Sequence, residues 1–338
     1  MTAEVPGGGA PSRPAPRPAR TLLSALCWAL VLPGLGWAVV RGFGLERGPL
    51  VQLLAFTPYV AAWSLIPLAL AAALRRWLAA ALAAVAALTL ISVVAPRALA
   101  DGGNGSADGP TVRVLTANLL AGAADPAALV ALVREQRVDL LALQEFTPDT
   151  EADLDRTGIA ELLPHRRTNP EVGTTGSALY SRFPLSAGGV RRNEGGFSQA
   201  YATVHVPGAP PVVVESAHPA APYALSMLPA WWADLRAQPP ATPGGPLRIL
   251  AGDFNATLDH APLRELLSTG YVDAADVTGA GLTGTWGPYD GDLIPPVTID
   301  HVLVDRRIGV RAVSVHPLPG SDHRPVLAEL TLPSDLRK

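Results

Sequence analysis

Five polar residues stand at or just past the carboxyl ends of apolar segments of β-strand type: Asn118, Glu145, His218, Asp253 and Asn255. A packed scaffold stops at such positions, and side chains that carry function often gather there. Carboxylate and amide oxygens can hold Mg²⁺ or Mn²⁺, and a histidine can exchange a proton with a reacting oxygen. Each residue alone fits an ordinary turn, cap or loop position. The five together predict one site.

Seven short strings follow one another along residues 111–333. They are LTANLL, LALQE, GSALYSRFP, VVVESAHP, LAGDFNA, TIDHVLVD and GSDHRPV. In this order they resemble the endonuclease/exonuclease/phosphatase superfamily, and GDFNA followed about 70 residues later by SDHRPV is the most specific part. The resemblance implies a deoxyribonuclease-like catalytic domain over 111–333, in a membrane-anchored bacterial member. Two β-sheets would pack face to face, with the site at one end of the sandwich.

The resemblance also implies a divalent-metal site. Glu145 matches the principal ligand, with Asn118 and Asp322 near the same ion or a second one. Mg²⁺ or Mn²⁺ is the implied ion, because hard oxygen ligands suit such cations and an anionic phosphate ester needs its charge offset when water attacks. Whether one ion or two bind stays open.

The remaining matched residues receive catalytic roles by the same resemblance. Asp253 would orient and deprotonate water, and Asn255 would donate a hydrogen bond to a phosphoryl oxygen. His218 and His323 would lie on opposite sides of the phosphate, as donors to its oxygens or to the leaving group. Asp300 matches the carboxylate that orients His323 and raises its basicity.

Two positions bear on the subfamily. His218 is typical of deoxyribonuclease-like, sphingomyelinase-like and inositol-phosphatase-like members, whereas members that resemble abasic-site endonucleases carry Asn there, which disfavours DNA repair. Trp286 follows Thr285 and resembles a Thr-Trp pair near the family's site. It is assigned to substrate binding, by stacking on a base or ring, with core packing as the alternative.

The elements that must position these residues are strands with helices between them. Strands are expected over 112–117, 138–143, 176–181, 200–206, 212–217, 247–251, 297–304, 310–315 and 325–330, and helices over 125–136, 224–237 and 259–267. Asp259 is expected to cap the last helix. The alternation predicts the α/β class, as two packed β-sheets flanked by helices in a four-layer α/β sandwich.

The first hundred residues have a different composition. Residues 1–20 form a Pro/Gly/Arg-rich tail that is expected to be disordered in the cytoplasm. Residues 21–97 contain three apolar runs, each near the roughly 20 residues that a helix needs to cross a bilayer. The runs predict three transmembrane helices, at about 21–40, 49–74 and 77–95. A Gly/Asp/Ser-rich linker, 98–110, leads to the catalytic domain.

Arginine placement predicts the orientation of these helices. Five arginines fall on the side that the positive-inside rule makes cytoplasmic, and three fall on the other side: Arg13, Arg17, Arg20, Arg75 and Arg76 against Arg41, Arg47 and Arg97. An odd number of crossings then predicts a multi-pass protein of the cell membrane with its catalytic domain outside the cytoplasm. Ala98-Leu99-Ala100 leaves open a cleavage after Ala100 that releases the domain.

Charge limits the choice of substrate. Residues 101–338 carry 18 basic and 27 acidic side chains, a net charge of −9. Such a domain gathers polyanions poorly, because that affinity comes from clustered cations. The prediction is a nuclease or other phosphodiesterase, with a lipid or small-molecule phosphodiesterase or phosphatase as the alternative and a non-catalytic phosphate-binding protein as a third reading. The apolar runs lack buried charges, which disfavours a transporter. No protein partner is predicted.

Overall fold

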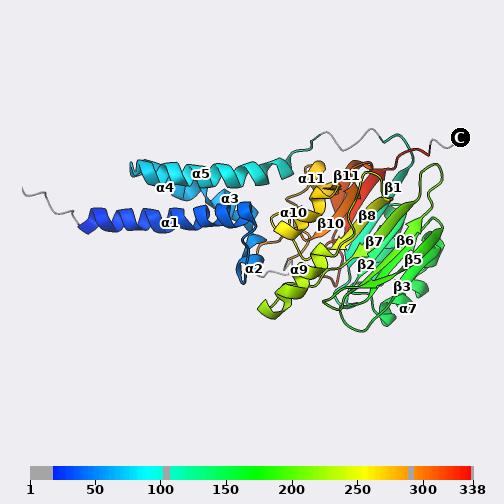
Figure 1. The fold of residues 1–338 in the computed structure, drawn as a ribbon. Helices are drawn as coiled ribbons and strands as arrows, with labels where there is room; N and C mark the ends of the chain where they lie inside the picture. The colour runs from blue at the N-terminus through cyan, green and yellow to red at the C-terminus, as the bar shows by residue number, and fades with distance from the viewer. Residues whose placement is uncertain (1–17, 102–106, 288–292, 336–338) are drawn as a thin grey trace, which may run out of the picture.

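The computed structural model describes residues 18–101, 107–287 and 293–335, in which a group of N-terminal helices stands beside a β-sandwich (Figure 1). Most of the expected tail, 1–20, and the middle of the expected linker, 98–110, lie outside the described residues.

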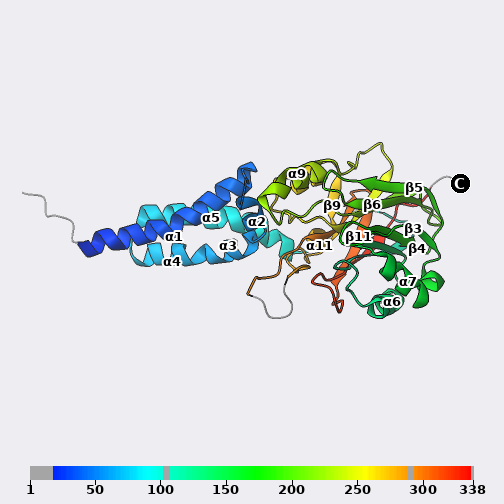
Figure 2. The same ribbon diagram turned by 90° about the horizontal axis from the view of Figure 1, so that it is seen from below.

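Apolar helices make up the N-terminal region. Their bounds are α1 Pro18–Phe43, α2 Leu50–Leu54, α3 Thr57–Trp63, α4 Leu65–Ala73 and α5 Trp77–Val94, followed by the 3₁₀ helix η1 Ala95–Ala98. α1, α4 and α5 lie side by side and extend away from the sandwich, whereas α2 lies against it (Figures 1 and 2). The helices therefore have one end at the sandwich and one end far from it.

Two segments in the described residues, Thr21–Phe43 and Trp77–Ala98, are helices long and apolar enough to cross a membrane. The prediction of one helix over 49–74 is wrong, because α2, α3 and α4 divide that run. The ring of Pro58 cannot continue a helix that begins at Leu50, since it has no N–H to donate. The Leu54 carbonyl instead accepts a hydrogen bond from Thr57 Oγ1 at 2.7 Å. The shorter apolar helix Thr57–Ala73 rises about 25 Å, which is less than the bilayer core.

Two six-stranded mixed sheets face each other in the sandwich. One has the order β11-β12-β1-β2-β4-β3 and the other the order β5-β6-β7-β8-β10-β9. The bounds are β1 Thr111–Asn118, β2 Leu140–Gln144, β3 His165–Asn169, β4 Ser177–Ser181, β5 Leu185–Arg192, β6 Ser198–Val204, β7 Val212–Ala217, β8 Leu247–Asp253, β9 Tyr271–Asp273, β10 Asp300–Asp305, β11 Gly309–Val315 and β12 Val326–Thr331. Side chains such as Val114, Leu179, Val214 and Ile249 fill the space between the sheets.

Helices cover the outer faces of both sheets. They are α6 Pro126–Glu135, α7 Pro148–Arg156, α8 Ile159–Leu162, η2 Leu225–Met227, α9 Leu228–Arg236, α10 Ala261–Ser268 and α11 Ala274–Val277. Leu129 of α6 packs in one cluster with Leu141 of β2, and Trp231 of α9 packs in another with Leu250 of β8. The expected α/β class, with two packed sheets flanked by helices, is confirmed.

Three strands were not expected from the sequence: β3, β5 and β9. β3 and β5 are edge strands with half-buried or exposed side chains, several of them arginine or glycine, so neither has an apolar run. β9 has three residues. The expected strand over 297–304 begins later, at Asp300, because Val297 pairs with Trp286 in an isolated bridge.

Parallel pairing brings the ends of four strands to one edge of the sandwich. β1 is parallel to β2, with Asn118 opposite Gln144, and β7 is parallel to β8. A Cβ on Gly252 would lie 1.9 Å from the Ala217 carbonyl oxygen, so no side chain fits between β7 and β8 at this point. This close approach places the residues that follow Ala217 next to Asp253.

A buried ion pair joins the helices to the sandwich. Asp259 accepts two hydrogen bonds from Arg97, at 2.7 and 2.8 Å, and one from Arg41 at 3.0 Å. The Asp259 side chain has no exposed surface. The expectation that Asp259 caps α10 is wrong: the N-cap position is His260, and both Asp259 oxygens bind arginine instead. The two arginines come from the ends of α1 and of η1, so one carboxylate holds two helices.

Candidate active site

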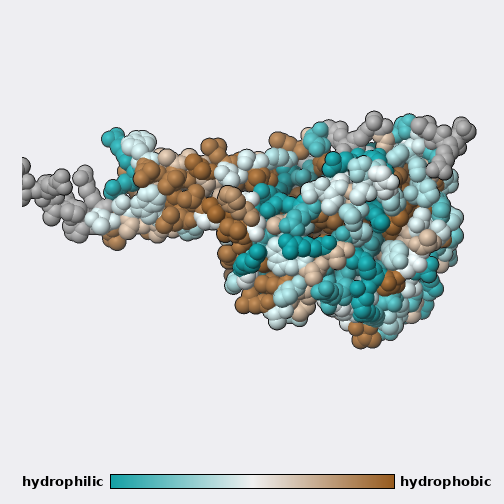
Figure 3. Space-filling view, viewed as in Figure 1, coloured by the Kyte–Doolittle hydropathy of each residue, from teal (hydrophilic) through white to brown (hydrophobic). Residues whose placement is uncertain are grey.

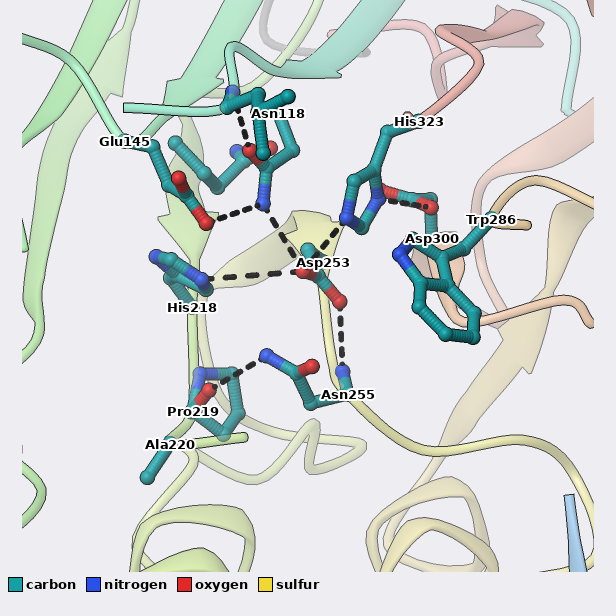
Figure 4. Close-up of polar contacts among 12 residues, drawn as sticks. Asn118, Glu145, His218, Pro219, Ala220, Asp253, Asn255, Trp286, Asp300 and His323 are labelled. Atoms are coloured by element: carbon teal, nitrogen blue, oxygen red, sulfur yellow. Dashed lines mark hydrogen bonds and ion pairs between the residues drawn. The ribbon is translucent and has the colours of Figure 1, made fainter. Parts of the chain in front are cut away.

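Seven of the nine predicted site residues line a cavity of about 420 Å³ at the strand-end edge of the sandwich, and the other two, Asn118 and Asp300, are hydrogen-bonded to lining residues (Figure 4). Asn118 ends β1, Asp253 ends β8 and Asp300 begins β10. Glu145 and His218 each follow a strand directly, after β2 and β7. His323 and Asp322 come from the loop between β11 and β12. The structure therefore brings together all nine predicted site residues, including Asn255 and Trp286.

Asn118 links the two sheets at the site. Its Nδ2 donates to Glu145 Oε1 and to Asp253 Oδ2, both at 3.1 Å, and its Oδ1 accepts from the Leu120 amide. Glu145 Oε2 accepts from the Ala121 amide at 2.6 Å. Burial raises the pKa of Glu145, against the hydrogen bonds from Asn118 and Ala121 that lower it. A cation beside this carboxylate would offset the cost of burying its charge.

The backbone at these loops adopts an uncommon conformation. Glu145 and Asn255 have φ of 56° and 49°, in the left-handed region that residues with a side chain rarely occupy. Leu120 and Ala121 also have positive φ angles, of 47° and 49°. Such strain persists where the surrounding structure imposes it, and it clusters at functional sites. Here it turns Glu145 Oε2 toward the Ala121 amide.

His323 and Asp300 form a buried pair. His323 Nδ1 donates to Asp300 Oδ2 at 2.9 Å, which leaves Nε2 facing Asp253 Oδ2 at 3.7 Å. Burial lowers the pKa of His323, but the carboxylates of Asp300 and Asp253 outweigh it and raise the pKa well above the usual histidine value. Burial likewise raises the pKa of Asp253. The site therefore holds a proton on His323 at neutral pH.

His218 has the opposite electrostatic environment. Its Nε2 lies 3.8 Å from Asp253 Oδ2, its ring meets Phe197 edge-on at 4.7 Å, and it is 1% exposed. Its Nδ1 has no hydrogen-bond partner among the described residues. Burial, followed by the charge on His323, lowers the pKa of His218 to about 3. His218 is therefore neutral, and Asp253 lies between one charged and one uncharged imidazole.

Asn255 lies on the other side of Asp253. Its backbone amide donates to Asp253 Oδ1 at 2.8 Å, and its Nδ2 donates to the Pro219 carbonyl at 3.1 Å (Figure 4). One Nδ2 proton is thus used within the protein, and the second is available to a ligand. This hydrogen bond from the Asn255 side chain to the Pro219 carbonyl also connects the loop after β8 to the loop that carries His218.

Trp286 and Asp322 form a third contact. The indole Nε1 donates to Asp322 Oδ2 at 2.9 Å, while Asp322 Oδ1 is buried and has no hydrogen-bond partner among the described residues. Trp286 also lines the cavity. The indole therefore orients Asp322, a role that the sequence did not suggest. Its predicted contact with substrate stays a prediction.

Two groups of side chains fit a metal ion. Asp253, Asp300 and His323 each offer a ligand atom, and these atoms lie within 4.8 Å of one another. This trio could bind a divalent metal, and within it His323 Nδ1 donates to Asp300 Oδ2. The predicted ligands Glu145, Asn118 and Asp322 include Asp322 Oδ1, which has no hydrogen-bond partner among the described residues and lies 3.9 Å from His323 Nε2. A buried oxygen without a hydrogen bond is costly, so it supports this second set.

Two other histidines near the site are structural. His301 Nδ1 lies 2.6 Å from Asp273 Oδ2, and its Nε2 donates to the Ala256 carbonyl. His260 Nδ1 accepts from the Thr257 amide, and its Nε2 donates to the Val51 carbonyl at 2.8 Å. Both side chains hold the loop after β8 in place.

The rest of the cavity lining is mostly apolar, and the sequence did not predict it. Four of these residues belong to α2 or to the link between α2 and α3, and four apolar ones belong to the sandwich: Val51, Gln52, Ala55 and Phe56, with Phe197, Tyr223, Ile294 and Val297. No pattern in the run 49–74 distinguishes residues that face a catalytic site from residues that face lipid. The helical region therefore contributes directly to the site.

The Endonuclease/Exonuclease/phosphatase family model matches residues 115–323, which contain every predicted site residue. The chain belongs to this family. The match begins within β1, so the helical region lies outside the family domain. No curated protein sequence matches the chain.

Solved structures share the fold of the family domain. An endonuclease/exonuclease/phosphatase from Beutenbergia cavernae DSM 12333 has a TM-score of 0.54 at 20% identity, covering 66% of this chain and 72% of that one. Humanized D. rerio TDP2 has a TM-score of 0.53 at 14% identity, covering 65% and 98%. Truncated Caenorhabditis elegans TDP2 has a TM-score of 0.50 at 18% identity, and the match covers 65% of this chain and 98% of that one. At such identities the likeness shows the family's fold and leaves the substrate to the site itself.

Proposed function

We propose that the protein is a membrane-anchored, divalent-metal-dependent hydrolase of phosphate esters. The main support for this proposal is the set of groups around one oxygen, Asp253 Oδ2. Asn118 Nδ2 lies 3.1 Å away, His323 Nε2 3.7 Å and His218 Nε2 3.8 Å. A buried carboxylate between an amide and two imidazoles suits a group that orients water and takes its proton.

Glu145, Asn118 and Asp322 would hold the ion, Mg²⁺ or Mn²⁺. When bound, it would offset charge on the phosphate and help to orient the ester. Two observations support a cation here: Asp322 Oδ1 has no hydrogen bond among the described residues, and burial raises the pKa of Glu145.

The protein's own side chains divide the remaining work. Asp253 holds the water and accepts its proton as the bond from water oxygen to phosphorus forms. His323, held by Asp300 and protonated, gives a proton to the oxygen that leaves as its bond to phosphorus breaks. His218 stays neutral and donates a hydrogen bond from Nε2 to a phosphoryl oxygen, and Asn255 donates its second amide proton to another. The net reaction adds one water across one P–O bond.

The anchor consists of α1 and α5, with the shorter α3–α4 segment packed beside them. The turn that carries Arg75 and Arg76 lies at the end of the helices far from the sandwich (Figure 1). Arg41 and Arg97, at the near end, are bound to Asp259. The positions of Arg75 and Arg76 at the far end favour a sandwich outside the cytoplasm. A reporter fused after Lys338 that is active only in the cytoplasm would overturn this orientation.

Hydrolysis is tested with the full chain in detergent micelles. Bis(p-nitrophenyl) phosphate with Mn²⁺ or Mg²⁺ should release p-nitrophenolate, and EDTA should stop the release until metal is restored. Turnover that persists in EDTA would contradict the metal dependence. No turnover on any ester, with phosphate-ligand binding intact, would favour the non-catalytic reading.

The substrate class is a finer part of the proposal. A nuclease remains the sequence-based preference, with a lipid or small-molecule ester as the alternative. Plasmid DNA, RNA, sphingomyelin and inositol phosphates, assayed side by side, separate these readings.

A further inference from the structure

The wall that α2 and α3 add to the active-site cavity is held firmly. Gln52 Nε2 donates to the Pro222 carbonyl at 2.7 Å, four residues after His218 in the chain. The Val51 carbonyl accepts from His260 Nε2 at 2.8 Å, on the loop that follows Asp253. Tyr59 Oη, on α3, donates to the Pro296 carbonyl at 2.6 Å. The helical segment is therefore attached to three loops of the site, including the loops that follow His218 and Asp253.

Three of the four residues by which this wall lines the cavity are apolar. They are Val51, Ala55 and Phe56, and they line the same cavity as Asp253 and His323. A ligand in this cavity would therefore meet both hydrocarbon and polar side chains. A ligand that satisfies both sides has an anionic group at one end and an apolar chain at the other.

Apolar side chains also surround the mouth of the cavity. Tyr223 is 75% exposed and Ile294 47%, and both line the cavity. Leu53 and Leu225 are exposed nearby, on α2 and η2. Figure 3 shows apolar side chains gathered where the helices meet the lower edge of the sandwich. Exposed apolar groups of this kind can mark a contact with a partner or a membrane.

The charge of the cavity argues against a polyanion. Among the described residues, none of those that line it is Lys or Arg. Nucleic-acid binding depends on cations that neutralise successive phosphates. A single phosphate needs only the groups around Asp253 and one metal ion.

We propose that the substrate is a phosphate ester of a lipid alcohol, drawn from the membrane in which the helices lie. The inference rests on the proposed function, since it assigns the substrate of the same site. The phosphate lies against Asp253, Asn118 and His323, and the hydrocarbon chain lies along Val51, Ala55 and Phe56. Water supplies the only co-reactant, and hydrolysis breaks one P–O bond of the headgroup.

The test uses two esters that release the same leaving group. Methyl p-nitrophenyl phosphate and dodecyl p-nitrophenyl phosphate differ only in chain length, and the full chain in detergent micelles hydrolyses both with Mn²⁺. Each methylene that the wall removes from water adds about 0.8 kcal/mol, so kcat/KM for the dodecyl ester should exceed that for the methyl ester by about 30-fold or more. Equal rates for the two esters, or faster cleavage of plasmid DNA than of the dodecyl ester, would overturn the inference while leaving the phosphoesterase intact.

Variants distinguish two causes of a high dodecyl-to-methyl ratio of kcat/KM: contact of the chain with the wall, and partition of the long ester into micelles. Ala55→Glu places a carboxylate on the wall and should lower the dodecyl-to-methyl ratio by about tenfold or more, because the chain then meets a charge. Ala55→Leu keeps the wall apolar and should keep the ratio. Ala127→Glu, on exposed α6 away from the cavity, is the matched control and should change neither rate. A ratio that Ala55→Glu leaves unchanged would overturn the inference. Loss of both activities in the wild-type chain would instead overturn the proposed function, and the inference with it.

Discussion

The cavity has two walls of different origin. The polar wall comes from strand ends of the family domain, and its residues bond to one another: Asn118 to Glu145 and Asp253, and His323 to Asp300. The apolar wall combines residues of the family domain with Val51, Ala55 and Phe56, which lie outside that domain in α2 and between α2 and α3. The part outside the domain is attached through the Val51 carbonyl and the Gln52 side chain. The comparison teaches that a segment outside the family domain completes the cavity, and under the proposed lipid substrate it would contribute to the choice of substrate.

The largest effect is expected at the centre of the polar wall. Asp253→Asn removes the group that takes the proton from water, so kcat should fall about 10³-fold for every ester, whatever its chain. Steady-state rates on the methyl and dodecyl esters measure this. Asp155→Asn, which removes an exposed partner of Arg166, is the matched control. A fall in kcat for only one of the two esters would contradict the assignment of catalysis to the polar wall and chain binding to the apolar wall.

The next effect concerns the joint between the walls. Asp259→Asn leaves Arg97 without its buried partner, which should cost about 3 kcal/mol in the free energy of unfolding. Thermal unfolding at neutral pH measures it. Glu265→Gln breaks an exposed pair with Arg236 and should cost about 0.5 kcal/mol or less.

The same joint should respond to acid. Burial raises the pKa of Asp259, but Arg97 and Arg41 outweigh it and hold the pKa below its usual value. The stabilisation is therefore complete above the unfolded-state pKa of about 3.9 and is lost as the pH falls through the lowered pKa. The difference in the free energy of unfolding between wild type and Asp259→Asn should become smaller below about pH 4. A difference that stays constant into acid would show that the carboxylate charge does not stabilise this contact.

A smaller catalytic effect is expected from the partner of His323. Asp300→Asn removes the carboxylate that raises the pKa of His323, so the basic limb of the pH–rate profile should move to lower pH and kcat should fall about 10²-fold. Asp273→Asn removes the same kind of partner from His301, outside the cavity. It should lower stability without moving the profile. A profile that Asp300→Asn does not move would remove His323 from the proton transfer.

The smallest effect should arise at the indole. Trp286→Phe removes the donor to Asp322 Oδ2, so kcat/KM should fall about 15-fold, as expected for one lost hydrogen bond to a charged group. Trp232→Phe, on α9 and away from the cavity, is the control. A dodecyl-to-methyl ratio that changes in Trp286→Phe would place the indole in contact with the chain of the substrate.

The polar wall could be predicted from the sequence because its residues occur in strings that follow apolar strands. Parallel β1–β2 and β7–β8 pairing then brings those strand ends together. The strands β3 and β5 could not be predicted, since they lie at sheet edges and carry arginine and glycine instead of an apolar run. Which three side chains hold a metal also depends on distances between loops, and no spacing in the chain encodes them.

The helical region shows the limit of hydropathy. Val51, Ala55 and Phe56 belong to an apolar run that reads as one membrane span, yet the run is broken before Pro58 and α2 turns onto the sandwich. Apolar composition does not distinguish a lipid neighbour from a protein neighbour. Asp259 likewise reads as a helix cap, because its arginine partners lie 162 and 218 residues away in the chain.

The position of α2 ahead of the family domain has a consequence for inheritance. A recombination event near the linker could exchange the helices while keeping every catalytic residue. Relatives with the same motifs could then differ in their substrates. Transfer of a substrate between homologues on the strength of the domain alone would then fail wherever the preceding helices differ. For this chain, the residues around position 55 are those to compare first.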